Sequence, residues 1–393
     1  NARPIRWNQV RHHWEIYLLV IPTLILIGLF QYYPAASGVF HSFYRWNGSD
    51  IAEYVGVKNY ADLLGDENFW RSFRIAFFLG LANIIKMIPA LAVAVAIHRC
   101  VSTRSQYFYR ILFVVPMVIP GLVTALIWRS FFFEATSGFL NKFLYGSGLI
   151  HVLAWIDKVT NLWGGTLASG QLPAWLGNPA LILTAIMIWG FPWVGSFAVL
   201  THLAKLQNIP KNVYEAADID GGSWWTKFTK IELPMISGSV YILLVFAIIE
   251  TIRDAGIVLA LAGFEGGPGG NATVPALFML RKAFVEQNGM GYACAIGIVL
   301  TAVVMILQKL STFVMERGGR WWDRIQARAS RLKTLIPAKA DLRDGQGHVE
   351  ETRRFRPTNK NVSRLLGFSR HAFIWAVLAA AFLPLYLMLV VSL

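Results

Sequence analysis

Three charged residues lie inside an otherwise apolar run, where a charge needs a partner or a polar solute. Glu250, Arg253 and Asp254 are spaced at i, i+3 and i+4, so they share one face if the run is a continuous helix. Charges within a membrane are costly, and they usually line a cavity or pair with one another. They could line a path for a hydroxylated solute, with Trp189 and Trp193 stacking on a sugar face, or form an ion cluster that holds helices together.

The motifs that carry catalysis or nucleotide binding are missing from the sequence. It has no G-x-x-x-x-G-K-[ST] phosphate-binding loop and no H-E-x-x-H zinc motif. The eight histidines are scattered, and the two cysteines are too few for a four-thiolate metal site. We therefore expect no catalytic residue, no metal site and no cofactor in this chain.

The segment 213–234, VYEAADIDGGSWWTKFTKIELP, is a different kind of pattern. Pro210 suits the first turn of a helix, and the acidic Glu215 and Asp218 should follow near the favourable N-terminal end of its dipole. The adjacent Ala216 and Ala217 would leave a slim surface that another protein could approach closely. Such a helix is a docking element rather than a catalytic one.

The second half of this segment should turn back toward the membrane. Gly221 and Gly222 are expected to end the first helix. A second short amphipathic helix with two tryptophans and a phenylalanine follows. Leu233–Pro234 should then halt that helix before the next span.

The elements that position these residues are apolar helices. Of the 393 residues, 55% are hydrophobic and only 15% are charged, whereas a soluble domain has about 25% charged residues. A spanning helix needs about 20 mostly apolar residues, which predicts a polytopic membrane protein. The seven expected spans are Ile16–Phe40, Ser72–Ile97, Ile111–Ser130, Ala180–His202, Ser239–Ala262, Gly291–Met315 and Ala372–Leu393.

The charge distribution predicts the orientation of these spans. With the N-terminus inside, 24 of the 36 Lys and Arg residues fall in cytoplasmic segments and 7 in outer ones, as the positive-inside rule requires. The most basic segment, 316–371, carries 14 of them and is expected to be a cytoplasmic linker. Its charge does not require nucleic acid as a partner.

The 213–234 segment resembles the signature of permease subunits of binding-protein-dependent ABC importers, which reads E-A-A, three residues, G, nine residues, then I-x-L-P. The matching residues are Glu215, Ala216, Ala217, Gly221, Ile231, Leu233 and Pro234. Further segments are similar to the carbohydrate-importing branch, so that the resemblance covers about residues 15–315; they are Tyr54–Tyr60, Phe69–Trp70, Gly266–Pro268, Asn271–Thr273 and Gly291–Ile296. The chain departs from the branch's frequent Phe-Asp pair at Arg253–Asp254.

The resemblance implies an all-α, polytopic fold with a six-helix permease core and a seventh C-terminal span. It implies import of a sugar or related polyhydroxylated solute. The signature loop would couple the permease to a cytoplasmic ABC ATPase dimer, which would bind ATP and Mg. The residues implied in coupling are Glu215, Ala216, Ala217, Asp218, Gly221, Leu233 and Pro234. The other implied partners are an extracytoplasmic solute-binding protein docked on outer loops that include 131–179, a second permease subunit or fused half, and membrane lipids.

The expected organisation places the chain in a bacterial or archaeal cytoplasmic (inner) membrane. A cytoplasmic tail, 1–15, precedes the six-span core, 16–315, which contains the coupling loop 204–237. The basic linker 316–371 then leads to an additional span, 372–393. That last span is similar to the first span of a partner permease, so it is either the start of a fused second permease or a helix appended to a single one.

Two other function classes stay open at this point. A secondary transporter would need only the intramembrane charges Glu250, Arg253 and Asp254 for coupling, and would show inverted repeats with broken helices. A membrane enzyme acting on lipid or glycan would show paired carboxylates or a metal motif at an interface. No convincing inverted repeat and no such motif is evident in the sequence.

Overall fold

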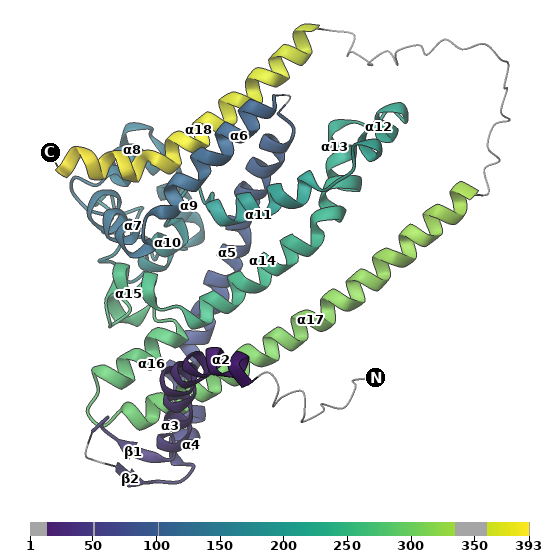
Figure 1. Cartoon of the computed structure of the whole chain (residues 1–393). Helices are drawn as coiled ribbons and strands as arrows, with labels where there is room; N and C mark the ends of the chain where they lie inside the picture. Colours follow the sequence, from purple (N-terminus) through teal and green to yellow (C-terminus); the bar gives the residue numbers. More distant parts are fainter. Residues whose placement is uncertain (1–13, 50–51, 101, 335–359, 393) are drawn as a thin grey trace, which may run out of the picture. The chain divides into compact units, whose positions relative to one another are not determined.

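The computed structural model of the protein describes residues 14–49, 52–100, 102–334 and 360–392. About three quarters of these residues are helical, and one two-stranded sheet is present among them (Figure 1). The all-α, polytopic fold class is therefore confirmed. Most of the expected tail 1–15 and the middle of the expected linker, 335–359, lie outside the described residues.

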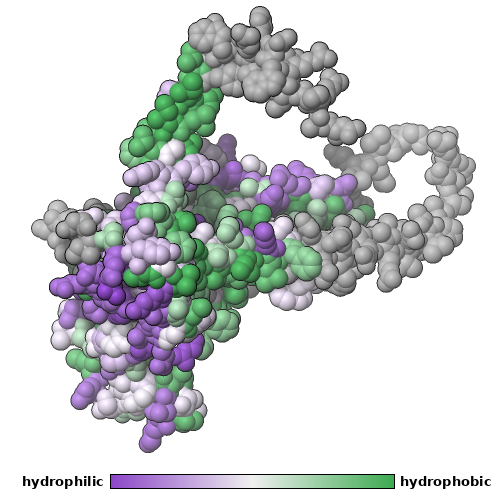
Figure 2. Space-filling model, turned by 90° about the horizontal axis from the view of Figure 1, so that it is seen from below, coloured by the Kyte–Doolittle hydropathy of each residue, from purple (hydrophilic) through white to green (hydrophobic). Residues whose placement is uncertain are grey.

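Several helices are long and apolar enough to cross a membrane. Among the described residues these are Leu18–His41, Glu67–His98, Trp224–Arg253 and Met290–Phe313. A fifth candidate is the helix pair Thr103–Val118 and Gly121–Phe132, which is bent by 81° at the break. Figure 2 shows wide hydrophobic areas beside a hydrophilic one on the face in view, as expected for helices that contact lipid.

Three of the expected spans are broken, and the first is Ile111–Ser130, which contains the 81° bend. The run 180–202 forms α10 (Ile182–Ile188) and α11 (Ser196–Gln207), with Gly190 and Pro192 between them. Glycine and proline both disfavour a helix interior, and average hydropathy does not register them. The run 239–262 is likewise divided into α14 (Leu233–Arg253) and α15 (Gly256–Ala262).

The helices at both ends of the expected linker extend beyond residues 315 and 372 into it. Helix α17 runs without interruption over Met290–Thr334, and α18 covers Lys360–Ser392. The segment 320–333 contains four Arg, two Ala and one each of Gln, Leu and Lys, which are strong helix formers. The two ends of the expected linker are therefore helical, and its middle, 335–359, lies outside the described residues.

One compact unit comprises Asn1–Arg74 and Val274–Val303. Its hairpin pairs Tyr44 with Tyr54 in antiparallel register. The buried Asn59 amide donates to the carbonyls of Ser42 and Tyr44, which fixes the hairpin against the helix that follows. Its elements are α2 (Trp14–Ile27), η1 (Gly28–Tyr32), α3 (Tyr33–His41), β1 (Tyr44–Trp46), β2 (Ala52–Tyr54), α4 (Lys58–Gly65), α16 (Pro275–Phe284) and the starts of α5 (Glu67–His98) and α17.

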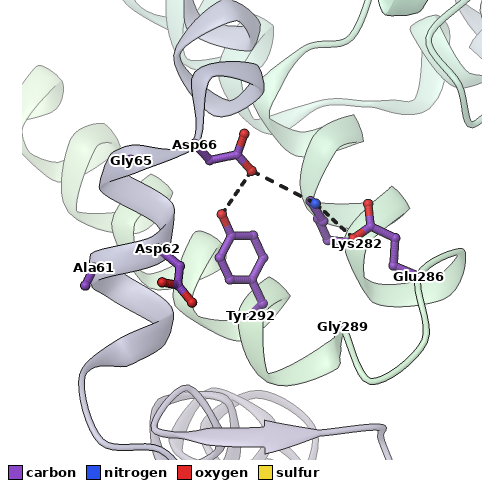
Figure 3. Close-up of a pocket in the computed structure, with 8 residues that line it drawn as sticks. All are labelled: Ala61, Asp62, Gly65, Asp66, Lys282, Glu286, Gly289 and Tyr292. Atoms are coloured by element: carbon purple, nitrogen blue, oxygen red, sulfur yellow. Dashed lines mark hydrogen bonds and ion pairs between the residues drawn. The ribbon is translucent and has the colours of Figure 1, made fainter.

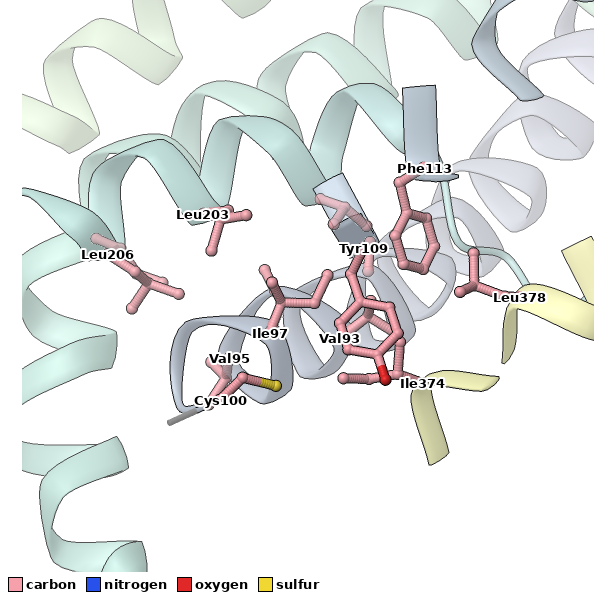
Figure 4. Packing of buried hydrophobic residues seen from close by; sticks show 14 of the residues in the cluster. Val93, Val95, Ile97, Cys100, Tyr109, Phe113, Leu203, Leu206, Ile374 and Leu378 are labelled. Carbon is pink, nitrogen blue, oxygen red and sulfur yellow. The ribbon is translucent and has the colours of Figure 1, made fainter. Parts of the chain in front are cut away.

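The second unit comprises Ile75–Thr273 and Val304–Leu393. Besides α10, α11, α14, α15, α18 and the remainders of α5 and α17, it contains α6 (Thr103–Val114), η2 (Val115–Val118), α7 (Gly121–Ile127), η3 (Trp128–Phe132), α8 (Phe139–Gly146), α9 (Leu149–Thr160), α12 (Lys211–Ile219), α13 (Trp224–Lys227), η4 (Phe228–Glu232) and η5 (Pro268–Gly270). Side chains from α5, α6, α11 and α18 form its hydrophobic core (Figure 4). Ile374 and Leu378 of α18 are fully buried there. The C-terminal helix thus packs on the helices of this unit.

Candidate functional site

Residues 204–237, here called the 204–237 loop, form two short helices joined by a glycine turn. Pro210 precedes α12, as its fixed φ favours. The backbone of Gly221 has φ +69°, a left-handed conformation that glycine adopts without strain. The N–H of Gly222 donates to the carbonyl of Ala217 at 2.7 Å. The expected helix and its glycine stop are therefore both present.

One side of α12 is exposed in the part of the chain that the structure describes. Glu215, Ala216 and Asp218 are exposed, and the Ile219 side chain is 87% exposed. Asp218 forms an ion pair with Lys227 of α13, which ties the two short helices together. An exposed isoleucine beside alanines and a carboxylate is a surface that another protein could cover.

An aromatic group continues this surface on α13. The hydroxyl of Ser223 caps the helix by accepting from the N–H of Thr226 at 3.2 Å. The rings of Trp224, Trp225 and Phe228 pack against one another, with centroids 5.5 to 5.9 Å apart. Both tryptophans are more than half exposed. They are placed to contact a protein or a membrane interface.

A buried ion pair connects the 204–237 loop to the end of α5. Arg99 Nε and Nη2 donate to Glu232 Oε1 and Oε2 at 2.8 and 2.7 Å. The Glu232 side chain is fully buried, and that of Arg99 is 13% exposed. The Arg99 guanidinium also lies 4.4 Å from the ring centroid of Trp224. One arginine thus contacts both ends of the segment 224–232.

Tyr214 extends this network to α12. Its hydroxyl donates to Glu232 Oε1 at 3.3 Å and lies 3.1 Å from His98 Nε2. Burial, together with the Glu232 charge, raises the pKa of Tyr214, so the hydroxyl remains a proton donor at neutral pH. The residue next to Glu215 is therefore tied to the end of α5.

Sequence reasoning did not identify this network. Glu232 occupies the unspecified position between Ile231 and Leu233, and Arg99 lies 133 residues earlier. The available signal was that a carboxylate and an arginine each adjoin an apolar run. Nothing in the sequence indicated that these two residues pair.

The expected helix stop at Leu233–Pro234 is wrong. Helix α13 continues through the π-helical residues Phe228–Glu232 into α14, and Pro234 is at the beginning of α14. Proline has no N–H to donate to the preceding turn. A single π-helical turn is a known way to shift the hydrogen-bond register of a helix. The chain thus enters the membrane helix without a break.

The intramembrane charges do not form the single-faced cluster that their spacing predicts. Helix α14 ends at Arg253, and Asp254 has an extended conformation. The Asp254 carboxylate accepts from the N–H of Gly256, at the start of α15. Glu250 and Arg253 are exposed, and the described residues contain no ion pair among these three side chains.

The two candidate solute-binding tryptophans lie at the break between α10 and α11. The Trp193 backbone has φ +60°, which is uncommon for a bulky residue, and its indole donates to the Ile188 carbonyl. The Trp189 indole nitrogen is buried without a hydrogen-bond partner among the described residues. Lys86 of α5 donates to the carbonyls of Ile186 and Trp189 at 3.2 and 3.4 Å. Lys86 therefore donates hydrogen bonds to backbone carbonyl groups at the C-terminal end of α10.

The long segment 131–179, which the sequence predicts to be on the outer side, is ordered by buried polar residues. The Asp157 carboxylate accepts from the N–H groups of Trp163 and Leu167, both at 2.8 Å. Burial alone would raise the pKa of Asp157, but these backbone donors lower it below its usual value. Asn141 bridges the carbonyl of Pro173 and the Trp175 indole. The segment is a folded surface that includes α8 and α9.

The first unit contains a polar pocket of about 500 Å³. Figure 3 shows Tyr292 and Lys282 converging on Asp66 from different helices. The Tyr292 hydroxyl donates to Asp66 at 3.1 Å, and Lys282 lies 4.0 Å from Asp66 and 2.8 Å from Glu286. This cluster joins the segment between α4 and α5 to α16 and α17. Across the part of the chain that the structure describes, no group of three His, Cys, Asp or Glu residues could hold a metal ion.

Comparison with known proteins identifies relatives over most of the chain. The family described as "Binding-protein-dependent transport system inner membrane component" matches residues 63–316. The diacetylchitobiose uptake system permease protein NgcF of Streptomyces coelicolor is 29% identical, over 80% of this chain and 86% of the relative. The multiple sugar-binding transport system permease protein MsmF of Streptococcus mutans is 28% identical, over 76% of this chain and 93% of the relative.

A solved structure has the same fold. The chain resembles a protein from a bacterial ABC transporter involved in the import of the acidic polysaccharide alginate, with a TM-score of 0.60 and 21% identity. The match covers 79% of this chain and 98% of that protein. A second structure, of a bacterial alginate ABC transporter in complex with a pentasaccharide-bound periplasmic protein, gives a TM-score of 0.61.

Proposed function

The chain belongs to the family of binding-protein-dependent transport system inner membrane components, and from this premise we propose that it is the permease of an ATP-driven importer for a sugar or related polyhydroxylated solute. It is a multi-pass membrane protein, and its relatives are transport permeases rather than enzymes. The named relatives take up diacetylchitobiose and multiple sugars, which supports a carbohydrate solute here.

The observation that carries the coupling part of the proposal is the exposed face of α12. This helix has an 87% exposed isoleucine at its end, yet it is held in place by the hydrogen bond from Tyr214 to Glu232 and by the Asp218–Lys227 ion pair. A rigidly held helix with an uncovered face suits a groove on a separate ATPase dimer, which would bind ATP and Mg. Docking of a cytoplasmic ATPase on α12 requires the 204–237 loop to lie on the cytoplasmic side, and with the predicted spans the N-terminus then lies there too.

The remaining partners follow from the same arrangement. The ordered outer segment 131–179 offers a surface for an extracytoplasmic solute-binding protein, and a periplasmic protein accompanies the related alginate transporter. A second permease subunit would complete the pathway.

Trp189 and Trp193 would contact the solute, because they lie where α10 is interrupted and offer aromatic surface inside the membrane region. Glu250, Arg253 and Asp254 would contribute polar lining.

The coupling role is tested by purifying the transporter from its native membrane and assaying which ATPase subunit accompanies it. Glu215→Ala should reduce the bound ATPase by at least tenfold, because Glu215 lies on the free face of α12. Asp220→Ala is the matched control, since Asp220 is an exposed carboxylate just beyond the helix end. Equal ATPase content in both variants would refute the proposed docking face.

The solute pathway needs a separate test. Uptake of labelled diacetylchitobiose and other oligosaccharides would be measured in proteoliposomes containing the assembled transporter. Trp193→Ala and Glu250→Gln should each raise the apparent KM for the transported sugar. If both variants retain the native KM and rate, these residues do not line the pathway.

A further inference from the structure

The Arg99–Glu232 pair joins two elements that separate segments of the chain bring together. Glu232 ends the π-helical segment that leads into α14, and Arg99 is the first residue after α5. The bidentate geometry fixes both the separation and the angle between the two groups. Through Tyr214, the same carboxylate also contacts α12.

Stability alone gives a weak reason for this pair. Two charges lose their hydration on burial, and replacing a buried ion pair with packed apolar residues is often neutral or stabilising. An ion pair differs from apolar packing in its strict geometry, because small displacements weaken its hydrogen bonds. Such a contact forces two elements to move together, whereas apolar side chains can slide past each other.

The end of α5 is firmly packed next to Arg99. Val93, Ala94 and Ile97 are each 0% exposed and belong to the core cluster of Figure 4. About one and two turns before Ala90, the nearest residue of this cluster, α5 donates from Lys86 to the carbonyls at the end of α10, and from Asn83 to Thr251 of α14. A displacement of α5 would therefore reach the interrupted helix that carries Trp189.

We propose that Arg99 and Glu232 are positioning residues that transmit movement of the 204–237 loop to α5. This inference rests on the proposed docking of an ATPase on α12. The continuous helix Trp224–Arg253 carries the movement directly into α14, and the ion pair adds α5 to the moving body. Helix α5 then acts on the end of α10 through Lys86.

Hydrogen–deuterium exchange of the purified transporter with its ATPase subunit tests this link without knowledge of the solute. Exchange is followed in peptides covering 211–219 and 90–99, with and without the nucleotide analogue AMP-PNP and Mg²⁺. In the native complex both peptides should change their exchange on nucleotide binding. In Arg99→Met/Glu232→Leu, peptide 211–219 should still respond and peptide 90–99 should lose its response.

The double substitution replaces both charged side chains with apolar ones of similar size. The fold of this variant is checked by thermal unfolding and by the amount of ATPase bound. Arg99→Lys is the conservative variant, and it should keep an intermediate response because lysine retains the charge without the fork of donors. A full response of 90–99 in the Met/Leu variant overturns the inference and leaves the proposed function standing. Absence of any response at 211–219 in the native complex overturns both.

Discussion

In each of the two compact units a tyrosine and a cationic side chain meet a carboxylate, but the two clusters differ in burial and geometry. In the second unit a tyrosine and an arginine meet Glu232, which is fully buried. In the first unit a tyrosine and a lysine meet Asp66, whose side chain is 18% exposed in an open pocket. The cation–carboxylate distance is 2.7 Å in the former and 4.0 Å in the latter. Only the former has two parallel hydrogen bonds.

This difference indicates which cluster is sensitive to change. A buried charge that loses its partner cannot be solvated by water instead, whereas a partly exposed charge that loses its partner is rehydrated. Lys282 also has Glu286 as a second partner at 2.8 Å. We therefore expect the 204–237 loop to depend on its ion pair, and the pocket cluster to tolerate substitution.

The largest effect is expected for Glu232→Ala. Removing this carboxylate leaves the Arg99 guanidinium without its buried partner, which should lower the free energy of unfolding by about 3–5 kcal/mol. The measurement is thermal unfolding of the purified protein in detergent. Glu53→Ala is the control, because its pair with Arg45 is exposed and should contribute less than about 1 kcal/mol. Equal effects of the two substitutions would contradict the comparison.

Asp157 is a buried carboxylate with no ion pair among the described residues, so its substitution separates the effect of burial from the effect of charge pairing. Asp157 accepts only from backbone donors in the contacts described above, so Asp157→Ala should cost about 3 kcal/mol by leaving buried N–H groups unpaired. Asp157→Asn, which keeps one acceptor oxygen, should cost less. Both are measured by the same unfolding assay.

The pH dependence of this variant pair follows from the lowered pKa of Asp157. A carboxylate with a lowered folded-state pKa contributes its stabilisation above its unfolded pKa of about 3.9 and loses it as the pH falls through the folded value. The stability difference between the native protein and Asp157→Asn should therefore shrink below about pH 4. A difference that is constant down to pH 3 would show that the charge of Asp157 is unimportant.

The smallest effect is expected in the pocket of the first unit. Asp66→Asn keeps an acceptor for the Tyr292 hydroxyl and leaves the Lys282–Glu286 pair intact. The unfolding free energy should change by less than about 1 kcal/mol. A loss above 2 kcal/mol would mean that this cluster is as tightly coupled as the buried one, and the distinction between the units would fail.

Local sequence signals predicted the local structure well. The glycine stop after α12 needs only one residue that tolerates a positive φ, and Gly221 supplied it. The break near Pro192 had a signal too, but averaging hydropathy over 20 residues concealed it. The pairing of Arg99 with Glu232 had none, because it depends on how α5 packs beside the loop. Long-range contacts between polar residues are set by packing rather than by sequence spacing.

The central claim, that α12 is the face on which an ATPase docks, is tested most directly by site-specific photo-crosslinking in native membranes. A benzoylphenylalanine would replace Ile219, which is 87% exposed, or Leu64 of the first unit, which is 62% exposed. The account predicts that the ATPase subunit is crosslinked from position 219 and not from position 64. Crosslinking from position 64, or from neither position while the ATPase co-purifies, would contradict it.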